Sequence, residues 1–269
     1  MQPTPGRNRW PFTLEKWYLD TLLPDGSVLL VYLGRMRLWG VSTAKLTAEL
    51  FRPGEPPREG HAGARDLVHR DGSVSLGPSK LSERSLRWET AGLSGELEFT
   101  PRYPAPAIRS PFLTSGDRRL EWTVELPDAD VRGEVRWPGG SLAISGRGYR
   151  DRVWFDLLPW RFPIRRLEWG RVAAGRHAAT WAVEHTDSGV VTCGWMDGQL
   201  TPGRPDGIEI GEGRVLVDGP VLDLRGLSLG AMRPLLKRVT GDPRQTKRAA
   251  TASIGGESGW AVYEDVLWG

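Results

Sequence analysis

The sequence predicts an all-β fold of the sandwich or barrel class, built from successive antiparallel hairpins. The chain of 269 residues carries 34 glycines and 21 prolines, which are spread along its length as turn signals. Short runs of alternating or β-branched character lie between these turns, at the spacing of about 8–12 residues that is typical of sandwiches and barrels. The repeated hairpins favour an up-and-down barrel.

Most of the predicted strands fall into hairpins. The first joins residues 15–23 to 27–33 across Pro24-Asp25-Gly26, because Asp-Gly supplies the positive φ angles that a tight turn needs. Further strand pairs are expected at 85–90 with 93–100, 119–126 with 131–137 around Pro127-Asp128, 177–185 with 190–195, 214–217 with 221–225 around Asp218-Gly219-Pro220, and 251–254 with 259–266. Only 43–51 and 227–239 have helical character, and Pro234 interrupts the second.

A domain boundary is expected near residues 140–146, where turn-forming residues gather at Pro138-Gly139-Gly140 and Gly146-Arg147-Gly148. The chain then divides into residues 1–140 and 141–269, and each part has the size of an independent domain.

Composition excludes several classes of partner and compartment. The net charge is +3, and the basic residues are scattered among 33 acidic ones without a concentrated stripe or a recognisable motif, so no nucleic-acid partner is expected. A single cysteine, Cys193, rules out an internal disulfide framework and fits a reducing compartment. The first residues contain no apolar run of signal-peptide length, and no stretch approaches the roughly 18 apolar residues that span a bilayer. We therefore expect a cytoplasmic protein without integral membrane contact, as a monomer or homodimer.

Motifs for metals and cofactors are not found in the sequence. It contains no His-Glu-x-x-His, no Cys-x-x-Cys, no Walker loop and no Gly-x-Ser-x-Gly. His177 and His185 would share a strand face but lie about 27 Å apart, too far to share one ion. Cys193 lies in an apolar strand and is expected to be a core residue. No metal and no cofactor are expected.

Tryptophan is abundant, with 13 residues in the chain. Its indole is suited to lining an apolar cavity, and its π face holds cations or polyenes. Some of these side chains are expected to form the wall of a cavity for a hydrophobic small molecule, and the others to fill the core.

The most distinctive segment is Gly146-Arg-Gly-Tyr-Arg-Asp-Arg-Val-Trp154, followed by Pro159-Trp160 and Leu167-Glu-Trp-Gly-Arg171. It resembles the hydroxyneurosporene synthase (carotenoid 1,2-hydratase) family, whose members typically show Gly-x-Gly-Tyr-His-Asp-His-x-Trp-Gly and then Trp-x-Trp-Gly-Arg. The segment Glu15-Lys-Trp-Tyr-Leu-Asp20 resembles that family's opening Glu-Trp-Trp-Tyr-x-Asp. The resemblance implies two lipocalin-like (calycin-type) antiparallel β-barrel domains, with a hydrophobic ligand within or between them. It also implies activities such as polyene hydration or the cyclisations of natural-product pathways, Diels–Alder cycloaddition among them.

The departures from the family pattern concern proton chemistry. Arg150 and Arg152 stand where the family has histidines, and Phe155 stands where it has glycine. Arginine stays protonated and cannot exchange a proton near pH 7 as histidine does. Asp151 between two guanidinium groups is expected to have a lowered pKa and to be a poor acid, which weakens the hydratase interpretation. In an extended strand, Arg150, Arg152 and Trp154 share one face, while Tyr149, Asp151 and Val153 share the other.

These residues lead to the hypothesis of a cofactor-free cyclase or isomerase that acts on an oxygenated polyene of polyketide or terpenoid type. The arginines would hold and polarise a substrate carbonyl in a dry chamber, and aromatic walls would fold the polyene. The candidate catalytic residues are Glu15, Tyr149, Arg150, Asp151 and Arg152. The candidate substrate-binding residues are Trp17, Tyr18, Asp20, Trp39, Trp154, Trp169, Arg171, Trp181, Trp195 and Glu264.

Alternative interpretations remain open. In the first alternative, the chain is a hydratase of a carotenoid-like or prenyl double bond, with Asp151 as the acid. In the second, it is a carrier that only binds a hydrophobic ligand. Structural roles are also open. The two arginines would then pair with Asp151 and Asp156 at the surface, and Glu15, Asp20 and Glu264 would be solvated strand-end charges. Trp169 and Arg171 would lock the two barrels together.

Overall fold

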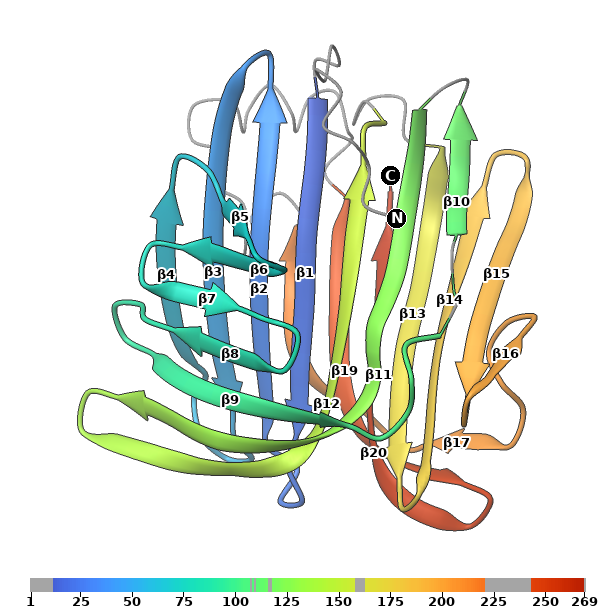
Figure 1. Cartoon of the computed structure of the whole chain (residues 1–269). Coiled ribbons are helices and arrows are strands. Elements are labelled where there is room, and N and C mark those ends of the chain that lie inside the picture. The colour runs from blue at the N-terminus through green and yellow to red at the C-terminus, as the bar shows by residue number, and fades with distance from the viewer. Residues whose placement is uncertain are drawn as a thin grey trace.

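The computed structural model describes residues 12–106, 108, 110–115, 118–157, 163–220 and 243–268. Every regular element in these ranges is a β-strand (Figure 1), and all named strand pairs are antiparallel. The predicted all-β class is therefore confirmed. Among the described residues, no helix is long and apolar enough to cross a membrane.

Within the described residues, the first sheet contains twelve strands and curls over on itself (Figure 1). Its order is β4-β3-β2-β1-β12-β11-β9-β8-β7-β6-β5, and β10 pairs with β11 beside this path. The strands are β1 (Phe12–Leu22), β2 (Val28–Leu38), β3 (Val41–Phe51), β4 (Arg58–Ala64), β5 (Val68–Arg70), β6 (Ser73–Leu76), β7 (Ser79–Leu81), β8 (Ser85–Trp88), β9 (Ser94–Pro101), β10 (Ser110–Ser115), β11 (Arg118–Trp137) and β12 (Gly140–Phe155). The short strands β5 to β8 cross in front of β1 to β4, so the sheet forms a lipocalin-like half-barrel (Figure 1).

The second sheet contains eight strands in the part of the chain that is described, in the order β16-β15-β14-β13-β20-β19-β17, and β18 pairs with β19. The strands are β13 (Ile164–Ala174), β14 (His177–Thr186), β15 (Gly189–Met196), β16 (Gln199–Thr201), β17 (Ile208–Ile210), β18 (Arg214–Pro220), β19 (Arg244–Ile254) and β20 (Glu257–Leu267). The chain passes from the first sheet to the second between Phe155 and Ile164. The boundary predicted at residue 140 falls at the β11–β12 turn, inside the first sheet, and the division into two domains stays a prediction.

Turn chemistry explains why the first predicted hairpin forms. Gly26 has a φ of +80°, which suits glycine, and Asp25 Oδ1 accepts a hydrogen bond of 2.9 Å from the amide of Ser27. Leu22 pairs with Val28 directly across this turn. The predicted pairs 85–90 with 93–100, 177–185 with 190–195 and 251–254 with 259–266 are likewise confirmed as β8–β9, β14–β15 and β19–β20.

Three local predictions are corrected by long-range pairing. Residues 43–51 lie in strand β3 and not in a helix, because Ala44, Leu46, Ala48 and Leu50 alternate into the core with at most 2% exposure. Residues 118–137 form one strand that continues through Pro127-Asp128, with a register shift between Leu126 and Ala129. Residues 214–220 form one strand paired with β19, so no turn occurs at Asp218-Gly219-Pro220. The predictions for 221–225 and 227–239 lie outside the described residues.

Three buried clusters of described residues set the layers of the molecule. One fills the curl of the first sheet and includes Leu46, Trp88 and Phe99. A second lies between the two sheets and includes Tyr18, Trp122, Tyr149, Trp169 and Trp195. A third covers the far face of the second sheet, around Trp181 and Ile254. The second cluster is built by both sheets, so the sheets form a continuous core where they meet.

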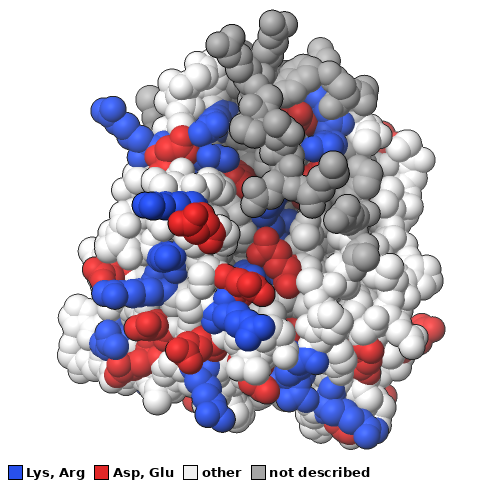
Figure 2. Space-filling view, viewed as in Figure 1, with Lys and Arg blue, Asp and Glu red and all other residues white. Residues whose placement is uncertain are grey.

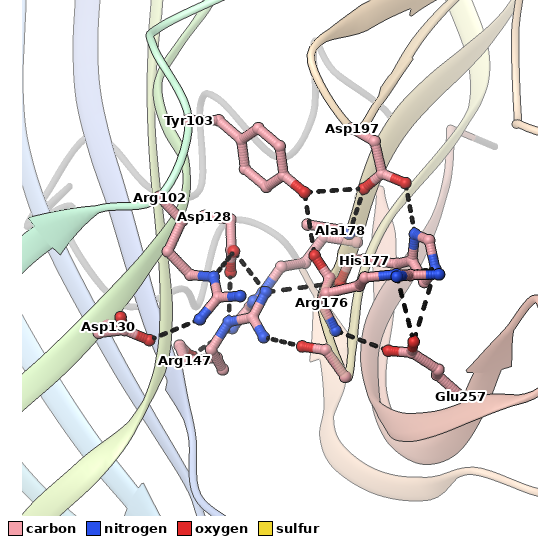
Figure 3. A network of polar contacts seen from close by, with 12 residues as sticks. Arg102, Tyr103, Asp128, Asp130, Arg147, Arg176, His177, Ala178, Asp197 and Glu257 are labelled. Atoms are coloured by element: carbon pink, nitrogen blue, oxygen red, sulfur yellow. Dashed lines mark hydrogen bonds and ion pairs between the residues drawn. The ribbon is translucent and has the colours of Figure 1, made fainter.

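A polar network joins the sheets at one end of this contact (Figure 3). Arg147 of β12 donates to both carboxylate oxygens of Asp128, which is fully buried, and to the carbonyl of Gly175 on the β13–β14 turn. Tyr103 donates to the carbonyl of Arg176 at 2.9 Å and to Asp197 at 3.2 Å. These bonds connect residues of the first sheet to the second sheet and fix how the two meet.

The surface does not concentrate one sign of charge on the face seen in Figure 2. Basic and acidic side chains are interspersed over the first sheet. The partner classes and the cytoplasmic location expected from the sequence remain predictions.

Candidate active site

The two sheets turn a set of polar and aromatic side chains toward each other. From the first sheet these are Lys16, Tyr18 and Asp20 of β1, Tyr32 of β2, Trp122 of β11, and Tyr149 and Asp151 of β12; from the second sheet they are Trp169 and Arg171 of β13, Glu184 of β14, Lys247 of β19 and Glu264 of β20. Strand register aligns them, because Tyr18 lies opposite Asp151, and Glu264 lies opposite both Trp169 and Lys247. We call this set the inter-sheet cluster.

Asp151 is the most distinctive group of the cluster. Its Oδ2 accepts hydrogen bonds from Trp122 Nε1 at 2.8 Å and from the Tyr149 hydroxyl at 3.0 Å. Its Oδ1 is buried and has no hydrogen-bond partner among the described residues. Burial raises the pKa of Asp151 to about 6, although the Trp122 bond and the nearby Lys16 favour the carboxylate. The carboxyl therefore exchanges its proton close to neutral pH.

The predicted lowering of the Asp151 pKa is wrong, because the two neighbouring arginines lie on the other face of β12. Arg150, only 6% exposed, pairs with Glu125 at 2.9 Å and donates to the carbonyl of Ser82 at 2.8 Å. Arg152 lies 3.7 Å from Glu15 and 5.7 Å from the centre of the Trp17 ring. Neither guanidinium pairs with Asp151, so the acid is not held ionised by them.

The arginines instead line a separate cavity of about 430 Å³ in the concave side of the first sheet. Trp17 and His69 line it with them, and Glu15 lies at its edge, 3.6 Å from His69 and 2.7 Å from Arg35. The sequence-predicted residues Trp17, Arg150 and Arg152 therefore line this cavity, apart from Asp151, and Glu15 lies beside it. The alternative pairing of the arginines with Asp151 and Asp156 is also not what forms, since Asp156 accepts from the amide of Arg119 at 2.8 Å.

Asp20 and Arg171 make a buried ion pair between the sheets. Both are at most 1% exposed, and Arg171 Nη2 donates to Asp20 Oδ1 and, at 3.0 Å, to the carbonyl of Arg147. Tyr18 donates to the other oxygen of Asp20 at 2.8 Å, and burial together with this carboxylate raises the pKa of Tyr18. This geometry fits the structural lock that the sequence left open as the role of Arg171.

The ammonium group of Lys247 lies beside this pair, enclosed by a carboxylate and aromatic rings. Lys247 Nζ is 2.7 Å from Glu264 Oε2, 4.0 Å from the centre of the Tyr18 ring and 5.1 Å from that of Trp169. Burial disfavours the charged amine, but Glu264 and Tyr32 outweigh it, and the pKa of Lys247 is raised. The aromatic faces of the cluster therefore already hold a positive charge.

Lys16 presents a second amine to the cluster. Its Nζ lies 5.4 Å from the centre of the Tyr32 ring, which Lys247 also approaches, at 5.6 Å. Burial lowers the pKa of Lys16, and the Lys247 ammonium adds to this while Glu264 opposes it. Across the part of the chain that is described, no carboxylate forms an ion pair with Lys16.

Sequence reasoning missed Glu184. The carboxyl shares the inward face of β14 with Thr180 and Ala182, is 3% exposed, and its Oε2 has no hydrogen-bond partner within the described ranges. Burial raises its pKa to about 8, so it is mostly protonated at neutral pH. Burial and Glu184 together raise the pKa of Cys193 to about 12, which fits the core role predicted for that thiol. The alternation of 177–186 was the available signal, because it gives residues 178, 180, 182 and 184 one face.

The remaining predicted residues lie in different places. Trp195 is buried between the sheets, with its ring centre 5.1 Å from that of Tyr103. Trp181 belongs to the cluster on the far face of the second sheet. Trp154 is half-buried, with the Arg119 guanidinium 5.3 Å from its ring centre, and Trp39 is 62% exposed at the β2–β3 turn. Trp39, Trp154 and Trp181 thus contribute neither to the inter-sheet cluster nor to the cavity that Arg150 and Arg152 line.

Metal ligands do not gather in the described residues, where no group of three or more histidine, cysteine, aspartate or glutamate side chains is placed to hold an ion. The side chains of the inter-sheet cluster supply an acid that titrates near neutrality, aromatic faces and two amines.

Comparisons with known proteins support the fold. No family model matches the chain, and no curated protein matches it. Among solved structures, a putative AttH from Nitrosomonas europaea is similar with a TM-score of 0.63 at 13% identity, over 97% of this chain and 94% of that one. CghA, solved with Sch210972, has a TM-score of 0.59 at 11% identity over 96% and 89% of the two chains. Kievitone hydratase from Nectria haematococca has a TM-score of 0.57 at 10% identity, also over 96% and 89%. The fold therefore matches the one expected from the sequence resemblance.

Proposed function

We propose that the chain is a cofactor-independent hydratase that adds water across a carbon–carbon double bond of a hydrophobic, oxygenated polyene or prenyl chain. The substrate lies between the two sheets, and Asp151 is the proton donor. The observation that supports this is the state of Asp151, which is buried, bonded through one oxygen only and has a pKa of about 6. A general acid works best when its pKa lies near the working pH.

The proposed reaction begins when Asp151 transfers its proton to one alkene carbon and leaves a carbocation on the other. The carboxylate that Asp151 becomes is the negative charge that stabilises this cation, because the faces of Tyr18, Tyr32 and Trp169 already hold the Lys247 ammonium. Water then adds to the cation, and the proton that it loses returns to the Asp151 carboxylate. The net change is the gain of one water molecule, and the acid is regenerated.

The likeness to kievitone hydratase supports the proposal at the level of fold. The proposal also answers the one reason for which the sequence disfavoured hydration. That reason was a carboxylate kept ionised by Arg150 and Arg152, and these side chains lie on the opposite face of β12.

Cyclisation is the second candidate, and the dryness of the cluster favours it. Asp20, Tyr149 and Asp151 are at most 4% exposed, so a second double bond of the same substrate competes well with water for the cation. Ring closure followed by return of the proton to Asp151 leaves the mass of the substrate unchanged. This route keeps the cyclase hypothesis but moves its chemistry from the arginines to the acid.

Incubation with a panel of linear oxygenated polyenes and prenylated phenols, in ordinary water and in deuterium oxide, tests the proposal. Mass spectrometry should show the gain of one water molecule and one carbon-bound deuterium with the wild-type chain, and neither with Asp151→Asn. Glu98→Gln, an exposed change on β9, is the matched control. An unchanged mass with a new retention time assigns cyclisation, and tight binding without turnover assigns a carrier. Full turnover by a folded Asp151→Asn protein would refute the role of the acid.

A further inference from the structure

The cavity lined by Arg150 and Arg152, which we call the arginine cavity, has no part in the proposed hydration. Its volume of about 430 Å³ lies in the range of about 300–1,000 Å³ that is usual for small-molecule sites. The two arginines point to the concave side of the first sheet, whereas Asp151 points to the inter-sheet cluster. The β5–β6 hairpin crosses in front of β1 and closes the outer side of the cavity with residues 69–74 (Figure 1).

Arg152 has unused hydrogen-bond donors at one end of this cavity. A guanidinium carries five N–H donors in a fixed fork, and that of Arg152 donates no hydrogen bond within the described ranges. Its ion-pair partner there is Glu15, at 3.7 Å. Glu15 is already bound to Arg35 at 2.7 Å and lies 3.6 Å from His69. One carboxylate is thus shared among three basic side chains, and the fork of Arg152 is left available for a second anion.

The groups around this end carry more positive than negative charge. Asp66 is the second carboxylate, and it binds Arg37 at 2.6 Å and Arg35 at 3.3 Å. Three guanidinium groups, those of Arg35, Arg37 and Arg152, therefore face two carboxylates, those of Glu15 and Asp66. An anionic group beside Arg152 would balance this charge.

The acidic residues that line the cavity lie beside Arg150 and at the mouth. Glu125 is 2.9 Å from Arg150 Nε, and Glu83 is a second acidic group whose charge acts on Arg150. At the mouth, Asp71 pairs with Arg70 at 3.3 Å, and both side chains are largely exposed. The positive charge that is not balanced is therefore that of the Arg152 end.

An apolar wall lies next to the Arg152 fork. Trp17, Val74 and Leu81 line the cavity and are at most 8% exposed. Trp17 is the direct register partner of Arg152 across β1 and β12, and the Arg152 guanidinium lies 5.7 Å from the centre of its ring. A ligand that bonds to Arg152 would therefore also contact an aromatic and aliphatic surface.

We propose that the arginine cavity is a second binding site, and that its ligand is a small organic carboxylate with an apolar body. Arg152 holds the carboxylate through its fork, and Trp17, Val74 and Leu81 contact the body. The inference does not depend on the proposed function, because the two sites lie on opposite faces of β12.

Isothermal titration calorimetry of the intact chain at physiological ionic strength tests the inference, with hydrocinnamate as the probe. Hydrocinnamamide keeps the body without the charge, and acetate keeps the carboxylate without the body. Arg152→Gln removes the fork, Val74→Phe fills the cavity and keeps both arginines, and Arg132→Gln is an exposed control on β11. We expect either change of ligand, and each of the first two variants, to weaken binding by about tenfold or more, because each removes the charge-assisted bond, the apolar contact or the space. The control should bind as the wild type does.

Several outcomes would overturn the inference. Unchanged binding in folded Arg152→Gln or Val74→Phe would place the probe elsewhere, for example against the amines of the inter-sheet cluster. Equal affinity for hydrocinnamamide or for acetate would contradict the class of ligand, and the absence of binding to the wild-type chain would contradict the site. Melting curves show whether each variant is folded, and the series of ligands needs the wild-type chain alone.

Discussion

Glu184 should make this protein less stable as the pH rises, whereas an ordinary paired carboxylate makes a protein more stable as the pH rises. The folded state raises its pKa from 4.5 to about 8 because of burial, and no cationic partner opposes this among its described neighbours. Below pH 4.5 the carboxyl is neutral in both states and contributes no difference. Between pH 4.5 and 8 the unfolded chain ionises first, so the free energy of unfolding falls as pH rises.

The size of this effect follows from the shift. One pKa unit corresponds to about 1.4 kcal/mol, so the shift of Glu184 lowers the free energy of unfolding by up to ~5 kcal/mol above pH 8. Relaxation and water entry reduce this value, and about 2–5 kcal/mol is expected. Such a loss is a large part of the total stability of an ordinary domain, which is about 5–15 kcal/mol.

Glu184→Gln removes the ionisable group and keeps the size of the side chain. Urea unfolding followed by tryptophan fluorescence at pH 5, 7 and 9 measures the free energy of unfolding for the wild type, Glu184→Gln and the exposed control Glu98→Gln. Any constant cost of the buried amide appears at every pH, whereas the gain from the lost charge grows between pH 5 and 9. A difference between Glu184→Gln and the wild type that stays constant over this range would refute the reasoning.

Three further variants test other contacts. Arg171→Met leaves the carboxylate of Asp20 buried without its cation and should lower the free energy of unfolding by about 3–5 kcal/mol in urea titrations; a loss below 1 kcal/mol would contradict the buried ion pair. Arg147→Ala should cost about as much, because Asp128 is fully buried and Arg147 bonds to both its oxygens, and it should also loosen the contact between the sheets, which hydrogen exchange at 176–178 would report. Arg152→Ala should weaken turnover far less than Asp151→Asn, and the reverse order of effects would restore the arginine-based hypothesis.

The fold class was accessible to sequence reasoning because it depends on local signals. Alternation predicted the β14–β15 hairpin correctly, and alternation together with Asp25-Gly26 turn chemistry predicted the β1–β2 hairpin correctly. Pro127-Asp128 was taken for a turn, yet the strand continues there because a register shift absorbs the proline and β12 pairs on both sides of it. Residues 43–51 contain good helix formers, and their strand conformation is decided by pairing with β2 and β4.

The site was accessible only in part. The alternation of β12 correctly separated Asp151 from Arg150 and Arg152, but the consequence drawn for the pKa of Asp151 was wrong, because proximity along the chain was treated as proximity in space. Electrostatic effects depend on which groups share a face and how dry that face is. Glu184 and Lys247 lie in strands that also carry other charged or titratable residues, so the sequence did not single them out, and only the meeting of the two sheets encloses them.

The protonation of Asp151 is the central claim, and infrared difference spectroscopy measures it directly. The carbonyl stretch of a protonated carboxylic acid should disappear with a midpoint near pH 6, and this signal should be missing from Asp151→Asn and present in Glu98→Gln. A midpoint near 4, the ordinary value for an aspartate, or a spectrum unchanged by Asp151→Asn, would contradict the account.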